Sequence, residues 1–151
     1  MILSELGVVA VFVLLVLLFW SPVLAFKRLR ALFRWPTRWL AANYLLLGGG
    51  VLLAQSVLYL VTILLIAGTG TVTGSDAVGI VGGVLAVNLL FPGAIAFAAL
   101  RVLPDRGYWT PDGDGVSGRI ELGIGVIWYA IVTSAGFVFL GLVLMFAYMP
   151  M

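Results

Sequence analysis

Five polar side chains lie near the middle of the long apolar runs of this sequence, and they are the first candidates for chemistry inside a membrane. Gln55 and Ser56 lie in one run, Asn88 in the next, and Thr133 and Ser134 in the last. Aligned by the midpoints of their runs, they fall at a similar depth and predict a polar layer near the bilayer centre. In transporters, substrate and ion sites lie at this depth between helices.

The same side chains also fit a structural role. Amides and hydroxyls in hydrocarbon need partners, and contacts between them on neighbouring helices contribute about 0.6 to 2 kcal/mol each. No carboxylate lies at this depth, which excludes coupling to protons or cations through a buried acid. Both hypotheses stay open, and packing is the favoured one.

Two missing residue types exclude several further kinds of chemistry. The chain has no Cys, which excludes disulfides and thiolate nucleophiles. It has no His, the usual axial ligand of haem and the side chain best suited to proton transfer near neutral pH. Asp112 and Asp114 alternate with glycines, but the spacing fails as a calcium loop and indicates a turn. We predict no catalytic residue, no metal and no cofactor.

Four apolar runs must position these residues. Of the 151 residues, 64% are hydrophobic and 9% are charged, whereas soluble proteins have about 25% charged residues. Each run can cross a hydrocarbon core of about 30 Å as a helix, which satisfies its own backbone. We expect one all-α membrane domain, residues 1–151, folded as an antiparallel up-and-down bundle of four transmembrane helices at about 6–26, 39–67, 77–100 and 122–148.

All the basic residues fall in two connections between these runs. The positive-inside rule therefore places residues 27–38 and 101–121 in the cytoplasm and both termini outside. The first connection carries a basic patch among aromatic residues, which could bind anionic headgroups or an acidic partner. The simpler interpretation is a topology determinant, and nucleic acid is not an expected partner. The patch consists of Lys27, Arg28, Arg30, Arg34 and Arg38.

Glycines at two places predict close helix contacts. Gly48, Gly49 and Gly50 follow one another, which indicates a kink, a tilt or a close approach of another helix. Gly79, Gly83 and Ala86 recur on one helical face, and small residues there let helix backbones approach in lipid.

Residues 22–30 and 92–101 share a string in which Pro is followed by Ala-Phe and then by Leu-Arg. The string predicts two helical hairpins related as parallel repeats, unless such residues simply recur at membrane boundaries. Arg outnumbers Lys seven to one, and Val, Ala and Gly are abundant. This composition is typical of a GC-rich genome such as that of a halophilic archaeon.

Three functions fit these observations, and the sequence alone does not identify the activity. The favoured one is a structural or accessory subunit of a membrane assembly, with the lipid bilayer and either further copies or other membrane subunits as partners. The alternative is a small oligomeric channel or transporter that uses the midplane layer. A third is an enzyme acting on lipid through loop acids near the headgroups, namely Asp105, Asp112, Asp114 and Glu121.

Overall fold

The computed structural model describes residues 2–113 and 115–149, which are mostly helical and contain no strand. Four of the helices are long and apolar enough to cross a membrane. This confirms the predicted fold class, and the chain is a multi-pass membrane protein. The elements are α1 (Ile2–Trp20), the 3-10 helix η1 (Ser21–Ala25), α2 (Lys27–Ala31), α3 (Leu40–Ala67), α4 (Gly74–Val102) and α5 (Gly118–Ala147).

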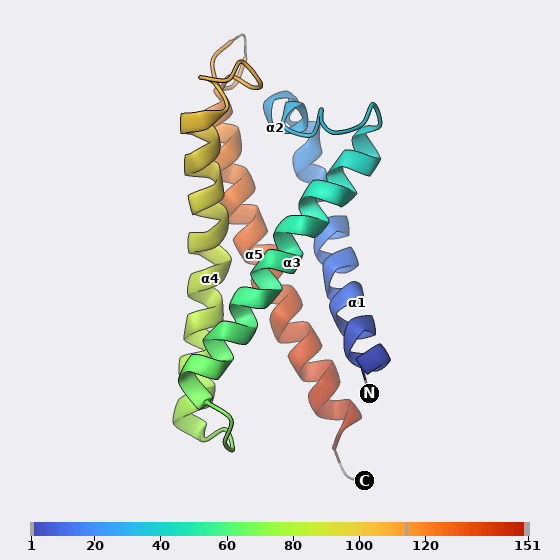
Figure 1. Cartoon of the computed structure of the whole chain (residues 1–151), viewed down its shortest axis with the longest axis vertical. Helices are drawn as coiled ribbons and strands as arrows, with labels where there is room; N and C mark the ends of the chain where they lie inside the picture. Colours follow the sequence, from blue (N-terminus) through green and yellow to red (C-terminus); the bar gives the residue numbers. More distant parts are fainter. Residues whose placement is uncertain (1, 114, 150–151) are drawn as a thin grey trace.

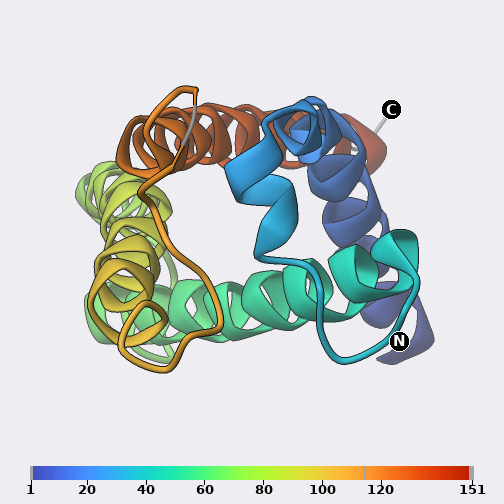
Figure 2. The ribbon, with the colours of Figure 1, turned by 90° about the horizontal axis from the view of Figure 1, so that it is seen from above.

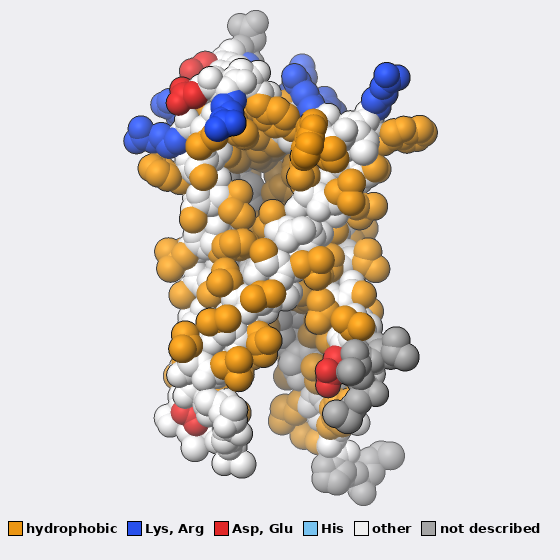
Figure 3. Space-filling model, viewed as in Figure 1, with side chains coloured by type: hydrophobic (Ala, Val, Ile, Leu, Met, Phe, Trp, Pro, Cys, Tyr) orange, Lys and Arg blue, Asp and Glu red, His pale blue; other side chains and the backbone are white. Residues whose placement is uncertain are grey.

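Helix α3 crosses the bundle diagonally, as Figure 1 shows. It lies against α4 near the connection of residues 68–73 and moves away from α4 toward the other end of the molecule. Seen from above in Figure 2, the four long helices surround the short α2. The Lys and Arg side chains gather at the end that carries α2, here called the basic end (Figure 3). The start of α1 and the end of α5 lie at the opposite end.

Helices α4 and α5 begin earlier than the apolar runs predict. At the start of α4, the Thr73 hydroxyl accepts the N–H of Asp76, and the Asp76 carboxylate accepts the N–H of Thr73 at 2.8 Å. This capping box satisfies free amides of the first turn. Ser117 caps α5 in a similar way through the N–H of Arg119. Polar caps thus extend each helix beyond its apolar segment.

The first helix is less regular than predicted. Its α-helical part ends at Trp20, and the 3-10 helix η1 continues from Ser21 with Pro22 in its first turn. Proline cannot donate the next helical hydrogen bond. By contrast, Pro92 is buried inside an uninterrupted α4. The two halves of the proposed repeat therefore differ at their prolines, and duplication stays a prediction.

The expected loop of residues 27–38 contains a helix, α2, that is fastened to the rest of the bundle. Oε2 of Glu121 accepts the backbone N–H of Arg28 at 2.9 Å and that of Leu29 at 3.1 Å. These amides belong to the first turn of α2 and have no partner within it. The Trp109 indole donates to the Arg28 carbonyl at 2.7 Å. Glu121, expected as a loop acid, is thus a buried anchor for α2.

The glycines form close contacts at some of the predicted positions. A Cβ added at Gly48 would lie 2.6 Å from Cδ2 of Leu17 in α1, whereas one at Gly49 or Gly50 would meet nothing within 4 Å. Gly79 and Gly83 pack against α3, where a Cβ at Gly83 would lie 2.5 Å from Cγ2 of Thr62. Gly48, Gly79 and Gly83 thus allow close contacts between helices of the same chain.

We predict that Glu121→Ala destabilises the protein by about 2 kcal/mol, because it leaves two amides of α2 without an acceptor. Thermal unfolding in detergent measures the loss, and hydrogen exchange should show faster exchange at Arg28 and Leu29. The exposed Asp105→Ala is the matched control and should change neither quantity. Unchanged exchange at these two amides in Glu121→Ala would contradict the anchoring role.

Candidate functional site

Polar side chains from three helices meet where α3 crosses the bundle, at a cluster we call the waist. It consists of Gln55 and Tyr59 from α3, Asn88 from α4, and Tyr129 and Ser134 from α5. Gln55 and Asn88 are completely buried. The waist therefore lies inside the bundle and joins α3, α4 and α5.

The hydrogen bonds of the waist form one connected network. The Gln55 amide donates to Oδ1 of Asn88 and to Oη of Tyr59, both at 2.7 Å. The Tyr129 hydroxyl donates to Oε1 of Gln55, and the Tyr59 hydroxyl donates to Oδ1 of Asn88. Nδ2 of Asn88 donates to Oγ of Ser134 at 3.0 Å. Each amide thus uses both its oxygen and its nitrogen within the waist.

Three of the five predicted midplane residues belong to this network, and two do not. Thr133 is buried beside it, but its hydroxyl donates to the Tyr129 carbonyl at 2.7 Å. Ser56 donates to the Leu52 carbonyl of its own helix at 2.8 Å. A hydroxyl that bonds to the preceding turn contributes little to contacts between helices.

Sequence reasoning missed the two tyrosines of the waist. A signal was present, because Tyr59 follows Gln55 by four residues and Tyr129 precedes Thr133 by four. Residues at that spacing share a helical face. Both tyrosines lie within the apolar runs, so the pattern of hydrophobic residues does not distinguish them from their apolar neighbours.

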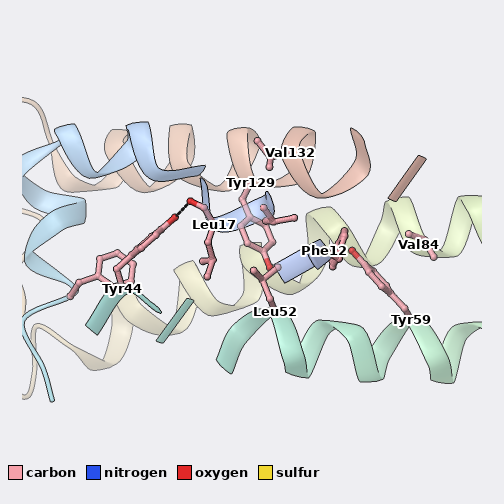
Figure 4. Packing of buried hydrophobic residues seen from close by; sticks show 10 residues of the cluster. Phe12, Leu17, Tyr44, Leu52, Tyr59, Val84, Tyr129 and Val132 are labelled. Carbon is pink, nitrogen blue, oxygen red and sulfur yellow. Dashed lines mark hydrogen bonds between the residues drawn. The ribbon is translucent and has the colours of Figure 1, made fainter. Parts of the chain in front are cut away.

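Aromatic rings extend from the waist in both directions. Toward the basic end, Trp20 stacks on Tyr44 with centroids 5.8 Å apart and meets Tyr129 edge to face. Toward the opposite end, Tyr59 contacts Phe12 and Phe137. Figure 4 shows this core, with the Tyr44 hydroxyl bonded to the Leu17 carbonyl. Hydrogen bonds from ring to backbone thus fix large apolar groups in the centre.

An apolar cavity of about 250 Å³ lies between the waist and α2. Tyr129 lines it on the side of the waist, and Leu29, Leu32 and Phe33 line it on the side of α2. Every long helix contributes to its wall. An apolar cavity stays dry but accepts apolar molecules.

A second, polar depression of about 510 Å³ adjoins this cavity at the basic end. Phe33 lines both. Arg28 of the predicted basic patch lies elsewhere, because its guanidinium points to the carbonyl of Thr110 at 3.4 Å. The other four residues of the patch line the depression, namely Lys27, Arg30, Arg34 and Arg38.

The loop acids do not form a cluster in the part of the chain that the structure describes. Glu121 is engaged with α2, while Asp105 and Asp112 are exposed. Asp114 lies outside the described residues. Among the described residues, no group of three or more acidic side chains is placed to hold a metal ion.

Comparison with known proteins gives one assignment. Residues 2–148 match the profile of a protein family described as a domain of unknown function (DUF8162). No curated protein and no solved structure matches the chain.

We predict that Asn88→Leu lowers stability by about 2 kcal/mol, because Gln55, Tyr59 and Ser134 each lose a partner. Gln55→Leu should cost a similar amount. The double variant should cost less than the two single losses combined, because removing both amides leaves fewer unpaired groups. Thermal unfolding in detergent gives these values.

Ser56→Ala is the matched control for this cycle, since Ser56 lies next to Gln55 but bonds only within α3. Its unfolding temperature should stay close to that of the wild type. Strictly additive losses for Asn88 and Gln55 would show that the two amides do not act as a unit.

Proposed function

We propose that this chain, which belongs to the DUF8162 family, is a structural or accessory subunit of a membrane assembly. The observation that carries the proposal is the closed hydrogen-bond network of the waist. Among the described residues, every buried side-chain nitrogen and oxygen has a hydrogen-bond partner. Groups that bond to one another in this way hold helices together and leave few donors or acceptors for a solute.

This network is the reason to place a structural role ahead of transport. A solute site at the midplane would need polar groups directed into a water-accessible space. Here Gln55 and Asn88 are completely buried and bonded to each other. The neighbouring cavity is lined almost entirely by apolar side chains, so it offers a polar solute no binding groups.

The arrangement of the loop acids also supports a role other than catalysis. Glu121, the buried acid at the basic end, already accepts two backbone amides. A metal-dependent lipid enzyme would instead need several carboxylates directed at one point.

The outward face of α4 is the surface we propose for assembly. Gly82, Ala86 and Gly93 lie on this face, and a Cβ added at Gly82 or Gly93 would meet nothing within 4 Å. Small residues four positions apart, as Gly82 and Ala86 are, let a second helix approach closely in lipid. The partner is a second copy of the chain or another membrane subunit.

We further propose that the basic end faces the cytoplasm. All eight Lys and Arg residues fall in the two connections at that end, and the connection of residues 68–73 contains none. Charge placed this way orients multi-pass proteins during insertion.

For the assembly proposal, we expect the particle purified from its native membrane in mild detergent to be larger than a monomer. Gly82→Leu with Gly93→Leu should reduce it to single copies while the thermal unfolding temperature is kept. Light scattering and native mass spectrometry measure the mass and composition. A wild-type monomer in both detergent and nanodiscs would contradict the proposal.

Two variants control this experiment. Gly123→Leu also adds a side chain on an open, exposed surface, but on α5, and should leave assembly intact. Gly83→Leu should instead destabilise the monomer, because its side chain would collide with Thr62.

The topology proposal predicts opposite labelling of two single-cysteine variants. The chain has no cysteine of its own, so Thr71→Cys and Asp112→Cys each introduce one reactive thiol at an exposed position. A membrane-impermeant maleimide added to intact cells should label the first variant and spare the second until the cells are lysed. The reverse pattern would place the basic end outside.

A further inference from the structure

We propose that the apolar cavity holds one acyl chain of an anionic phospholipid from the leaflet at the basic end, with the phosphate of that lipid in the adjoining basic depression. This binding site does not depend on the proposed assembly, and it rests on four features of the described residues.

The first feature is the chemistry of the cavity. Its wall is apolar, and its volume of about 250 Å³ exceeds the ~150 Å³ of an engineered apolar cavity that stays dry and binds benzene. Water gains too few hydrogen bonds there to be stable. A hydrocarbon chain is the apolar molecule that a membrane supplies.

The second feature is the position of the opening. Helices α3 and α4 are packed closely through Gly83 and Thr62 near the opposite end and separate toward the basic end (Figure 1). On the face seen in Figure 3, the surface is hollowed between these two helices, just below the basic side chains. Ile95 of α4 lines the cavity and is 41% exposed, so it belongs to the rim. The cavity therefore opens sideways, where acyl chains lie.

The third feature is the charge beside the cavity. Four basic side chains line the depression, and no acidic residue is among its lining residues. Each such charge attracts an anionic headgroup with about 1 kcal/mol near a membrane surface. A lipid without net charge could place an acyl chain in the cavity, but its headgroup would not be attracted by the four basic side chains.

The fourth feature is the closeness of the two spaces. Phe33 is buried and is a lining residue of both the cavity and the depression. A headgroup at Arg30 and Arg34 would thus have its acyl chains within reach of the cavity. This neighbourhood favours an amphiphile with both parts over a free phosphate or a free hydrocarbon.

Photocrosslinking of the full-length chain in phosphatidylcholine nanodiscs tests the site. The probe is phosphatidylglycerol with a diazirine near the end of one acyl chain, and peptide mass spectrometry maps the adducts. We expect adducts on residues of the cavity wall, namely Leu47, Val51, Ile95, Ala96 and Ala99. Adducts spread only over outward-facing residues such as Leu90 and Phe97 would overturn the proposal.

A matched pair of substitutions tests the cavity itself. Ala99→Phe fills the cavity and should abolish the mapped adducts, whereas Ala98→Phe on the exposed face of the same helix should retain them. Retention in Ala99→Phe would overturn the proposal. If Ala99→Phe fails to fold, the adduct map of the wild type decides.

The charges are tested with a phosphatidylcholine probe that carries the same diazirine chain. Arg30→Gln and Arg34→Gln should each lower labelling by phosphatidylglycerol about fivefold at low salt and leave labelling by phosphatidylcholine unchanged. Arg119→Gln, at the same end but outside the depression, is the control. Equal labelling of the wild type by both probes would refute the headgroup site, and competition by inorganic phosphate would show a phosphate site without lipid.

Discussion

The absence of water from the hydrocarbon core is the constraint on which this structure depends. Two amides at that depth, Gln55 and Asn88, must find their partners within the protein. They do so by using each other and two tyrosine hydroxyls, which requires α3, α4 and α5 to meet at one point. The waist thus specifies the crossing of the helices more narrowly than apolar packing does, because Leu and Val side chains pack equally well against lipid.

A single crossing point determines where space opens in the bundle. Helix α3 stays packed against α4 from the connection of residues 68–73 to the waist and leaves α4 toward the basic end. The volume between them is filled by Trp20, Phe33 and the underside of α2, and what they do not fill is the apolar cavity. Glu121 matters here because it holds α2 over that space. Polar contacts at two depths therefore shape an apolar cavity between them.

Depth along each helix could be predicted from the sequence, whereas rotation about the helix axis could not. The lengths of the apolar runs identified the four helices and placed Gln55, Asn88 and Ser134 at one level. Ser56 lies at that level too, but one residue turns it by about 100° away from Gln55, and its hydroxyl bonds within α3. Glu121 is separated in the sequence from Arg28 by 93 positions and from Leu29 by 92. No local sequence pattern indicates a contact over that separation.

The positive-inside rule explains how many charges lie at the basic end but not how they are arranged. Orientation during insertion depends on the number of Lys and Arg residues near the ends of the helices, so any distribution over the two connections would suffice. The structure instead separates Arg28, which points to the loop carbonyl of Thr110, from four others that line one depression. Grouping like charges opposes folding unless a counter-charge is supplied. The proposed anionic headgroup would supply that charge beside the apolar cavity, which is why we treat the charges and the cavity as parts of one proposed site.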